Sequence, residues 1–222
     1  MSSTLRKEIR KRVKSDLRVF FGYDETDEIR KFQGKNEPFL YMDHAYFDRG
    51  YERGNFRVIY NTIHRTNVLD VPDDRRKKFK TTLKEWRRGE KILFIPAPKN
   101  PLWFHRDRDW NDWALQKLLE STDREIVVKK KKTIGLGDSI HNCYALVTHS
   151  SVAGVEAACN GIRVVGPKTS PAYPVGVEID KINDLIEPDR TKWVNTLCYS
   201  QFTLDELSNG TCWQIIKETE NL

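Results

Sequence analysis

The sequence predicts an α/β protein with two Rossmann-like lobes, of which the N-terminal one is shortened, and closing helices at the C-terminus. In the second half of the chain, short apolar runs alternate with segments of helical periodicity, which is the pattern of βαβ units. In the first half, the strand candidates are shorter and the polar segments are longer. The length of 222 residues suits two small domains. We therefore predict a short lobe with a linking helix over 1–88, a Rossmann-like lobe over 89–188, and closing helices over 189–222.

The first half contains three strand candidates and two helix candidates. The stretch Pro72–Arg88 begins with proline and two aspartates and ends in basic residues before Gly89, an order of charge that matches the helix dipole. We expect this stretch to be the helix that joins the lobes. The other elements are predicted at Arg18–Phe21, near Asp24–Phe32, at Phe39–Met42 and at Arg57–Tyr60.

The second half predicts a parallel sheet covered on both faces. Val152–Cys159 is small and apolar and is followed by Asn160 and Gly161, which stop a helix well. Thr203 and Glu206 form a candidate capping box at the entry to the last helix. The strands are expected at Lys91–Pro96, Glu125–Val128, Ala145–Thr148 and Arg163–Val165, and the other helices at Trp110–Leu119, Asp189–Tyr199 and Leu204–Lys217.

Composition narrows the class of protein. Hydrophobic residues make up 38% of the chain, which excludes wholesale disorder. No apolar run is long enough to span a bilayer, and the segment Met1–Lys14 is too charged for a signal peptide, so we expect a soluble, cytoplasmic protein. The four cysteines form no CxxC pair, which argues against a zinc site and against a disulfide framework. We expect reduced, mostly buried thiols and no metal.

The charge balance favours an anionic partner. Lysine and arginine outnumber aspartate and glutamate by 38 to 32, a net charge of +6. The excess is concentrated in the arm around Arg6–Lys14, in the stretch Arg75–Arg88 and in the run Lys129–Lys132. Each run alone is more often a solvated face than a binding surface. Together they favour a polyanion, and nucleic acid, nucleotide and acidic polysaccharide all stay open.

The segment Ala145–Gly166 carries the strongest chemical signal. A strand ends in Thr148, His149, Ser150 and Ser151, and a helix of small residues begins at once. Free backbone N–H groups and hydroxyls then lie at the positive end of the helix dipole, which is an anion site at the carboxyl edge of a parallel sheet. Glu156 is placed to accept hydrogen bonds from ribose hydroxyls. The plainer reading is a serine N-cap with a surface glutamate.

These residues resemble a known family. The string T-x-S-S-x-x-G-x-E-A from Thr148, followed by N-G and an apolar strand into G-P, is similar to the donor-binding half of GT-B glycosyltransferases. The likeness is to capsule-type Kdo transferases and bacterial sialyltransferases, and to small phage-encoded glycosyltransferases. Asp43-His44-Ala45-Tyr46-Phe47, with Arg49 beyond, is similar to the acidic element in the acceptor half of the Kdo transferases. The resemblance covers roughly Phe39–Pro167 and is specific around Thr148–Pro167.

The resemblance implies a role for each candidate residue. Asp43 or His44 would remove the acceptor proton, with Asp43 favoured by the family element and His44 by its ordinary pKa. A nucleotide sugar would be the co-substrate, and the resemblance to GT-B enzymes implies no metal. The donor would be held by Lys129, Lys131, Thr148, His149, Ser150, Ser151 and Glu156, and acceptor or phosphate would be contacted by Arg49, Lys99 and Arg106.

Tryptophans near the start of the second lobe give a further candidate. Trp103, Trp110 and Trp113 lie in one short stretch with His105, Arg106 and Arg108, a mixture that suits stacking on a base or a sugar. The alternative is that Trp110 and Trp113, three residues apart, form the buried face of a helix.

Together these observations predict a nucleotide-sugar-dependent glycosyltransferase that acts on a hydroxyl acceptor. We favour a hydroxymethylated base in phage DNA over a glycan, because the chain is basic and the acceptor half is short. The alternative is a non-catalytic nucleic-acid-binding module on a degenerate GT-B scaffold, and a nucleotide-sugar epimerase is a third hypothesis. The oligomeric state, the donor nucleotide and the stereochemical outcome stay open.

Overall fold

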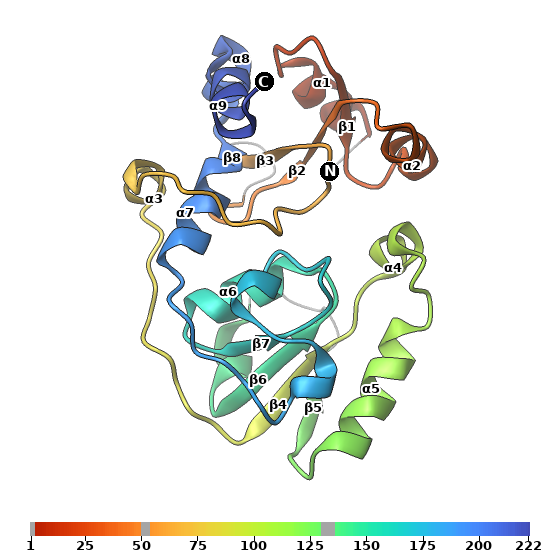
Figure 1. Cartoon of the computed structure of the whole chain (residues 1–222), viewed down its shortest axis with the longest axis vertical. Coiled ribbons are helices and arrows are strands. Elements are labelled where there is room, and N and C mark those ends of the chain that lie inside the picture. Colours follow the sequence, from red (N-terminus) through yellow and green to blue (C-terminus); the bar gives the residue numbers. More distant parts are fainter. Residues whose placement is uncertain (1–2, 50–53, 130–135) are drawn as a thin grey trace. The chain divides into compact units, whose positions relative to one another are not determined.

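The computed structural model describes residues 3–49, 54–129 and 136–222, and shows an α/β protein (Figure 1). Backbone contacts divide the chain into two compact units. Unit 1 combines Met1–Thr81 with Thr191–Leu222, and unit 2 is Thr82–Arg190. The helices expected to close the molecule over 189–222 therefore belong to unit 1 instead of forming a part of their own.

Unit 1 is built around a mixed four-stranded sheet in the order β1-β2-β3-β8. Only β1 and β2 run parallel, whereas β3 is antiparallel to both β2 and β8, so this sheet differs from the parallel Rossmann arrangement expected for the lobe. Its elements are α1 Ser3–Lys11, β1 Arg18–Phe21, α2 Thr26–Lys35, β2 Phe39–His44, β3 Phe56–Tyr60, α3 Asp74–Lys78, α7 Thr191–Tyr199, β8 Gln201–Phe202, α8 Leu204–Asn209 and α9 Thr211–Glu220.

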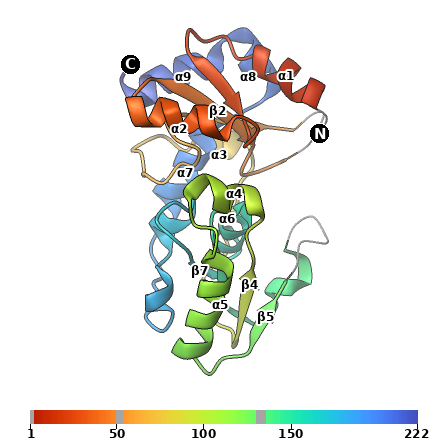
Figure 2. The same ribbon diagram turned by 90° about the vertical axis from the view of Figure 1, so that its right-hand side faces the viewer.

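Alternation along the strands of unit 1 buries both faces of the sheet. Leu40, Met42 and Val58 pack in one core with residues of α1, α8 and α9, including Ile9 and Ile216. On the other face, the rings of Phe20 and Phe39 meet Phe32 of α2 edge to face. Figure 2 shows α2 and α9 on opposite sides of β2.

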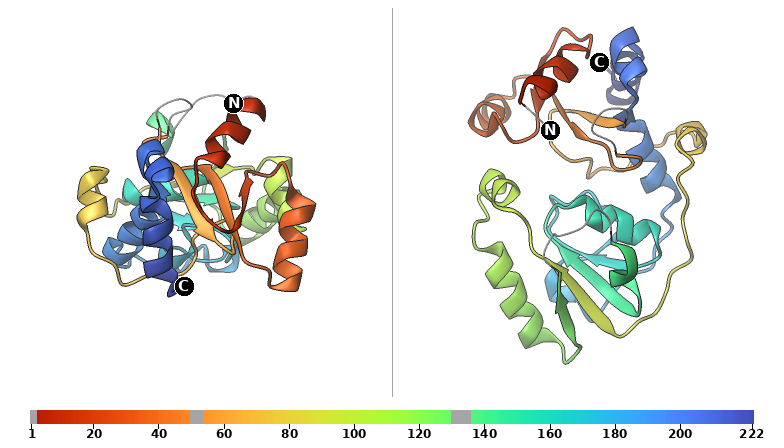
Figure 3. Two further views of the ribbon diagram at one scale, coloured as in Figure 1. Left: turned by 90° about the horizontal axis from the view of Figure 1, so that it is seen from above. Right: turned by 180° about the vertical axis from the view of Figure 1, so that it is seen from behind.

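Unit 2 has the predicted parallel sheet, in the order β5-β4-β6-β7. Its α5 packs on one face, where Trp110, Ala114 and Leu118 join the core with Phe94 and Val147. Helix α6 covers the other face (Figure 3). The elements are β4 Lys91–Ile95, α4 Lys99–His105, α5 Trp110–Ser121, β5 Ile126–Val128, η1 Gly137–Ile140, β6 Cys143–Thr148, α6 Val152–Cys159, β7 Arg163–Val165, η2 Tyr173–Val175 and η3 Ile179–Lys181.

The prediction of one helix over Pro72–Arg88 is wrong. Only Asp74–Lys78 is helical, and the chain leaves the helix through Lys80, which has a left-handed φ of 49°. Residues 82–89 are extended, because their backbone finds other partners in unit 2. Lys84 N donates to Cys159 O at 2.9 Å and Arg87 N donates to Gly161 O at 2.8 Å.

The last predicted helix, Leu204–Lys217, is two helices. The break falls at Gly210, whose φ of 92° suits glycine and ends α8 before α9 begins. The capping box between Thr203 and Glu206 is confirmed. Helix α4 was not predicted, since its sequence begins at Lys99 within a stretch rich in proline.

All four cysteines are buried, and none of them forms a disulfide among the described residues. Burial raises the pKa of Cys143 and of Cys198 to about 11, so both are held as thiols. Within residues 3–49, 54–129 and 136–222, no helix has the length and apolar character needed to cross a bilayer.

Candidate functional site

The candidate site lies at the carboxyl ends of β4 and β6, where the strand order of unit 2 changes direction. From β4 the chain passes to β5 on one side, and from β6 it passes to β7 on the other. Ligands of open parallel sheets bind at such a switch point. Ile95 and Thr148 are paired at the ends of the two strands, and Thr148 Oγ1 donates to Ile95 O at 2.9 Å. Thr148 thus holds the two strand ends together.

His149 follows Thr148 and is fully buried. Its Nε2 lies 3.2 Å from Asp107 Oδ2, and its ring meets Trp110 edge to face at 5.1 Å. A carboxylate only accepts hydrogen bonds, so Nε2 carries the proton and Nδ1 has a bare lone pair. This Nδ1 is buried and bonds to none of the residues that the structure describes.

Burial controls the charge of His149. Loss of solvation lowers the pKa of the imidazole, and the neighbouring Asp107 carboxylate opposes this in part. The folded protein therefore holds His149 neutral at neutral pH. A neutral imidazole with one nitrogen fixed by an aspartate is a base that can take up a proton at the other nitrogen.

Ser150 and Ser151 complete what we call the β6 corner, defined as His149, Ser150 and Ser151. Ser150 Oγ is buried and has no partner in the described part of the chain. Ser151 caps α6, since its Oγ accepts from Ala153 N at 3.2 Å. Buried polar atoms usually have partners, so two orphan atoms on consecutive residues mark a place where a ligand would bond.

Lys129 and Glu156 both form hydrogen bonds with the segment around Leu136. Lys129 Nζ donates to Leu136 O at 2.9 Å and to Ser139 Oγ at 2.6 Å. Glu156 Oε1 accepts from Leu136 N at 2.9 Å. Both predicted donor-binding side chains thus hold the chain at Leu136. Lys131, the other predicted cation, lies outside the described residues.

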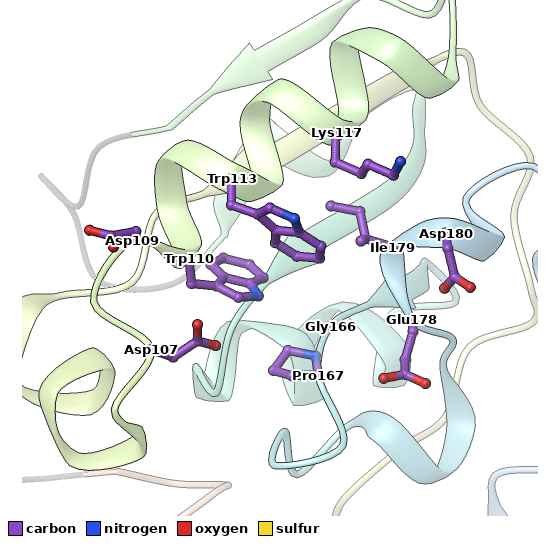
Figure 4. Close-up of a pocket in the computed structure, with 10 residues that line it drawn as sticks. All are labelled: Asp107, Asp109, Trp110, Trp113, Lys117, Gly166, Pro167, Glu178, Ile179 and Asp180. Atoms are coloured by element: carbon purple, nitrogen blue, oxygen red, sulfur yellow. The ribbon is translucent and has the colours of Figure 1, made fainter.

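A pocket of about 620 Å³ is lined in part by Asp107, the residue that contacts His149 of the β6 corner (Figure 4). Trp113 and Lys117 extend from α5, and Glu178 and Asp180 come from the facing segment at η3. The Trp113 side chain is 50% exposed, whereas Trp110 is buried and stacks on Phe94. The other lining residues are Asp107, Asp109, Gly166, Pro167 and Ile179.

The pocket lining is acidic in a basic protein. Four carboxylates face one lysine among its residues, so the pocket disfavours a phosphate. Carboxylates accept hydrogen bonds from hydroxyls, and an exposed indole offers an apolar face with one polar edge. This combination suits a neutral ring that carries several hydroxyls.

The predicted acceptor residues Asp43 and His44 belong to unit 1. Asp43 Oδ2 accepts from Arg57 Nη2 at 2.8 Å and from Tyr41 OH at 3.2 Å, and its Oδ1 accepts from His44 N at 2.7 Å. Arg57 is only 3% exposed and faces Asp43 across the β2–β3 pair. Asp43 is therefore the counter-ion of a buried arginine, whatever else it does.

His44 is half-buried, and its ring stacks against Phe56 at 6.0 Å. Burial lowers its pKa, with a smaller opposing effect from Asp43, so His44 is neutral near pH 7. Arg49 is exposed after the end of β2.

The remaining predicted contacts, Lys99 and Arg106, lie at the two ends of α4. Lys99 is its first residue, and Arg106 is its C-cap with a left-handed φ of 59°. Both side chains are exposed.

Thr148, His149, Ser150 and Ser151 lie together in the structure, as expected for four consecutive residues. It also adds Asp107, which sequence reasoning missed. The available signal was its position between Arg106 and Arg108, two residues that were noticed for their charge.

Comparison with known protein families, with curated proteins and with solved structures found no match. Among the described residues, no group of three or more His, Cys, Asp or Glu side chains is placed to hold a metal ion.

Proposed function

We propose that the protein is a metal-independent glycosyltransferase that uses a nucleotide sugar and transfers the sugar to a hydroxyl acceptor. One observation carries this proposal. The buried His149, its partly exposed partner Asp107 and the orphan Ser150 hydroxyl lie together at the switch point of a parallel sheet, where α6 begins. The resemblance of Thr148–Pro167 to the donor half of GT-B glycosyltransferases supports the same assignment.

The donor phosphate is assigned to the β6 corner. Ser150 Oγ can donate to a phosphate oxygen, and the first backbone N–H groups of α6 add a partial positive charge. A phosphate beside Nδ1 would raise the pKa of His149, because an anion favours the imidazolium. The imidazolium would then donate a hydrogen bond to the phosphate and stabilise the charge that develops on it.

The transferred sugar is assigned to the neighbouring pocket. Trp113 offers its face to the ring, and the carboxylates of Glu178 and Asp180 accept from its hydroxyls. In the reaction, the bond from the anomeric carbon to the phosphate oxygen breaks and the bond to the acceptor oxygen forms. The acceptor proton passes to a base, and the phosphate leaves with the electron pair of the broken bond.

His44 is the better candidate for that base. Asp43 already balances Arg57 and accepts three hydrogen bonds. His44 is neutral near pH 7, which is the form that takes up a proton. The favoured acceptor is a hydroxymethylated base in phage DNA, and a glycan is the alternative.

The first experiment is a thermal-shift panel of CMP-, UDP-, GDP- and dTDP-sugars. We expect one nucleotide class to raise the melting temperature by several degrees, because a ligand at 100 times its Kd contributes about 2.7 kcal/mol. Ser150→Ala should weaken donor binding about tenfold, the loss expected for one hydrogen bond to a charged group. Ser121→Ala, in the same unit but away from the corner, is the matched control.

A flat panel, or equal donor binding by wild type and Ser150→Ala, would overturn the assignment of the donor site. Once the donor is known, mass spectrometry of products tests the acceptor. DNA with hydroxymethylated bases should gain the mass of one sugar per modified site, and unmodified DNA should gain none. Isomerised nucleotide sugar without any conjugate would indicate an epimerase instead.

A further inference from the structure

An extended segment of unit 2, residues 82–89, leads into β4 and is called the strap here (Figure 1). It is fixed along its length. Besides its two backbone bonds to the end of α6, its carbonyl at Arg87 accepts from Arg163 Nη2 at 3.0 Å. Gly89 lies so close to Cys143 that an added Cβ would be 2.4 Å from that residue's carbonyl carbon. The side chains of the strap are therefore presented from a rigid backbone.

The strap forms one wall of a polar groove of about 500 Å³. The groove is lined by Arg87, Arg88, Lys91, His141 and Asn142. Arg87 and Arg88 are exposed. Neither guanidinium pairs with a carboxylate of the described residues.

Acidic residues near the groove are already engaged. Glu125 pairs with Lys91 at 3.0 Å, and Glu90 accepts from Asn142 Nδ2 at 3.0 Å. The two arginines thus supply charge that nothing described in unit 2 neutralises. Exposed arginines that extend from a fixed backbone and have no carboxylate partner among the described residues are suited to an anion from outside.

We propose that this groove binds the phosphate backbone of duplex DNA. Guanidinium groups match phosphate geometry, and His141 and Asn142 add further hydrogen-bonding groups to the lining. All five lining residues are polar. A protein partner would call for an apolar centre, which this lining does not provide.

The groove lies at the amino ends of the strands of this sheet, and the β6 corner lies at their carboxyl ends. Lys91 begins β4 and Asn142 precedes β6, whereas the corner follows the last residue of β6. Six residues of strand separate the two ends by about 20 Å. DNA in the groove would therefore leave the donor site of unit 2 open. This inference concerns binding alone and is independent of the proposed transfer activity.

The test is DNA binding by the full chain, without any donor, as a function of salt. We expect a duplex of about 20 base pairs to bind with an affinity that falls between about 50 and 200 mM salt. Arg87→Gln and Arg88→Gln should each make the slope of log K against log salt shallower by about 0.9, the value for one lost phosphate contact. Lys181→Gln, which removes an exposed charge elsewhere in unit 2, should leave the slope unchanged.

Three outcomes would overturn the proposal. One is the absence of DNA binding at low salt. Another is an equal loss of slope in Arg87→Gln and Lys181→Gln, which would show diffuse attraction by net charge. The third is that a polyglutamate peptide competes with DNA as well as unlabelled duplex does. Because both arginines are exposed and the strap is held by its backbone, the variants should have the same melting temperature as the wild type.

Discussion

At the scale of single residues, the buried His149 and the half-buried His44 make stability depend on pH. Burial lowers the folded-state pKa of His149 and of His44 below the ordinary value near 6.5. At a pH between the folded-state pKa of each histidine and its ordinary pKa, the unfolded chain binds more protons than the folded one. The free energy of unfolding should therefore have its full value above about pH 6.5, and it should decrease as the pH falls below 6.5.

Urea unfolding between about pH 7.5 and pH 5.5 measures this decrease. His149→Gln should flatten the dependence in part, and His44→Gln should remove a further part. Glu206 has its pKa lowered to about 2 because hydrogen bonds from Arg75 and Lys78 outweigh the effect of its burial, so its protonation falls at far lower pH. Unchanged pH dependence in both variants would contradict the environments described here.

The sequence predicted the local structure of the β6 corner, namely the end of β6 and the start of α6. The β6 corner is a strand end followed at once by a helix start, and both are written in consecutive residues. Asp107 lies 42 residues before His149, and only the packing of α5 on the sheet brings them together. The pairing of Asp43 with the buried Arg57 could not be predicted either, because no residue next to Asp43 in the sequence indicates that partner.

At the scale of elements, the junction between the strap and the end of α6 depends on Gly161. Its φ is 77°, and a Cβ added there would lie 1.9 Å from Glu85 O in the strap. Gly161→Ala should destabilise unit 2 by more than the roughly 1 kcal/mol that a left-handed alanine costs, because the strap must also move. Gly137→Ala is the matched control, with a φ of 50° and open space around it.

Chemical unfolding of both variants gives the comparison. Equal losses of stability would mean that the strap is loosely held, and would also weaken the case for a rigid basic groove. A much larger loss in Gly161→Ala would place the strap within the cooperative structure of unit 2.

The strap also explains why one element was mispredicted. The charge order of Pro72–Arg88 is typical of a helix, and its first turns do form α3. The rest of the stretch makes its backbone hydrogen bonds with Cys159 and Gly161, more than seventy residues away. Tertiary partners of this kind override local propensity. The strands of unit 2 were predictable because burial on both faces leaves a nearly continuous apolar run in each.

At the scale of the whole molecule, the two units differ in how the chain builds them. Unit 1 needs two separate segments, whereas unit 2 is one continuous segment. The two ends of unit 2 are also tied to each other. Arg190 Nη2 donates to Lys84 O at 2.6 Å, Trp86 Nε1 donates to Pro188 O at 3.2 Å, and the Arg190 guanidinium lies over the Trp86 ring at 3.9 Å.

These ties predict that residues 82–190, expressed alone, fold as an independent domain. Circular dichroism should show a single cooperative thermal transition, because the sheet, its two covering layers and both ends of the segment lie within unit 2. If the β6 corner and the neighbouring pocket hold the donor, the isolated segment should also bind the nucleotide sugar within a few-fold of the Kd of the full chain. A folded segment that fails to bind the donor would contradict the assignment of the donor to unit 2, and a segment that does not fold would show that the end ties are too weak without the rest of the chain.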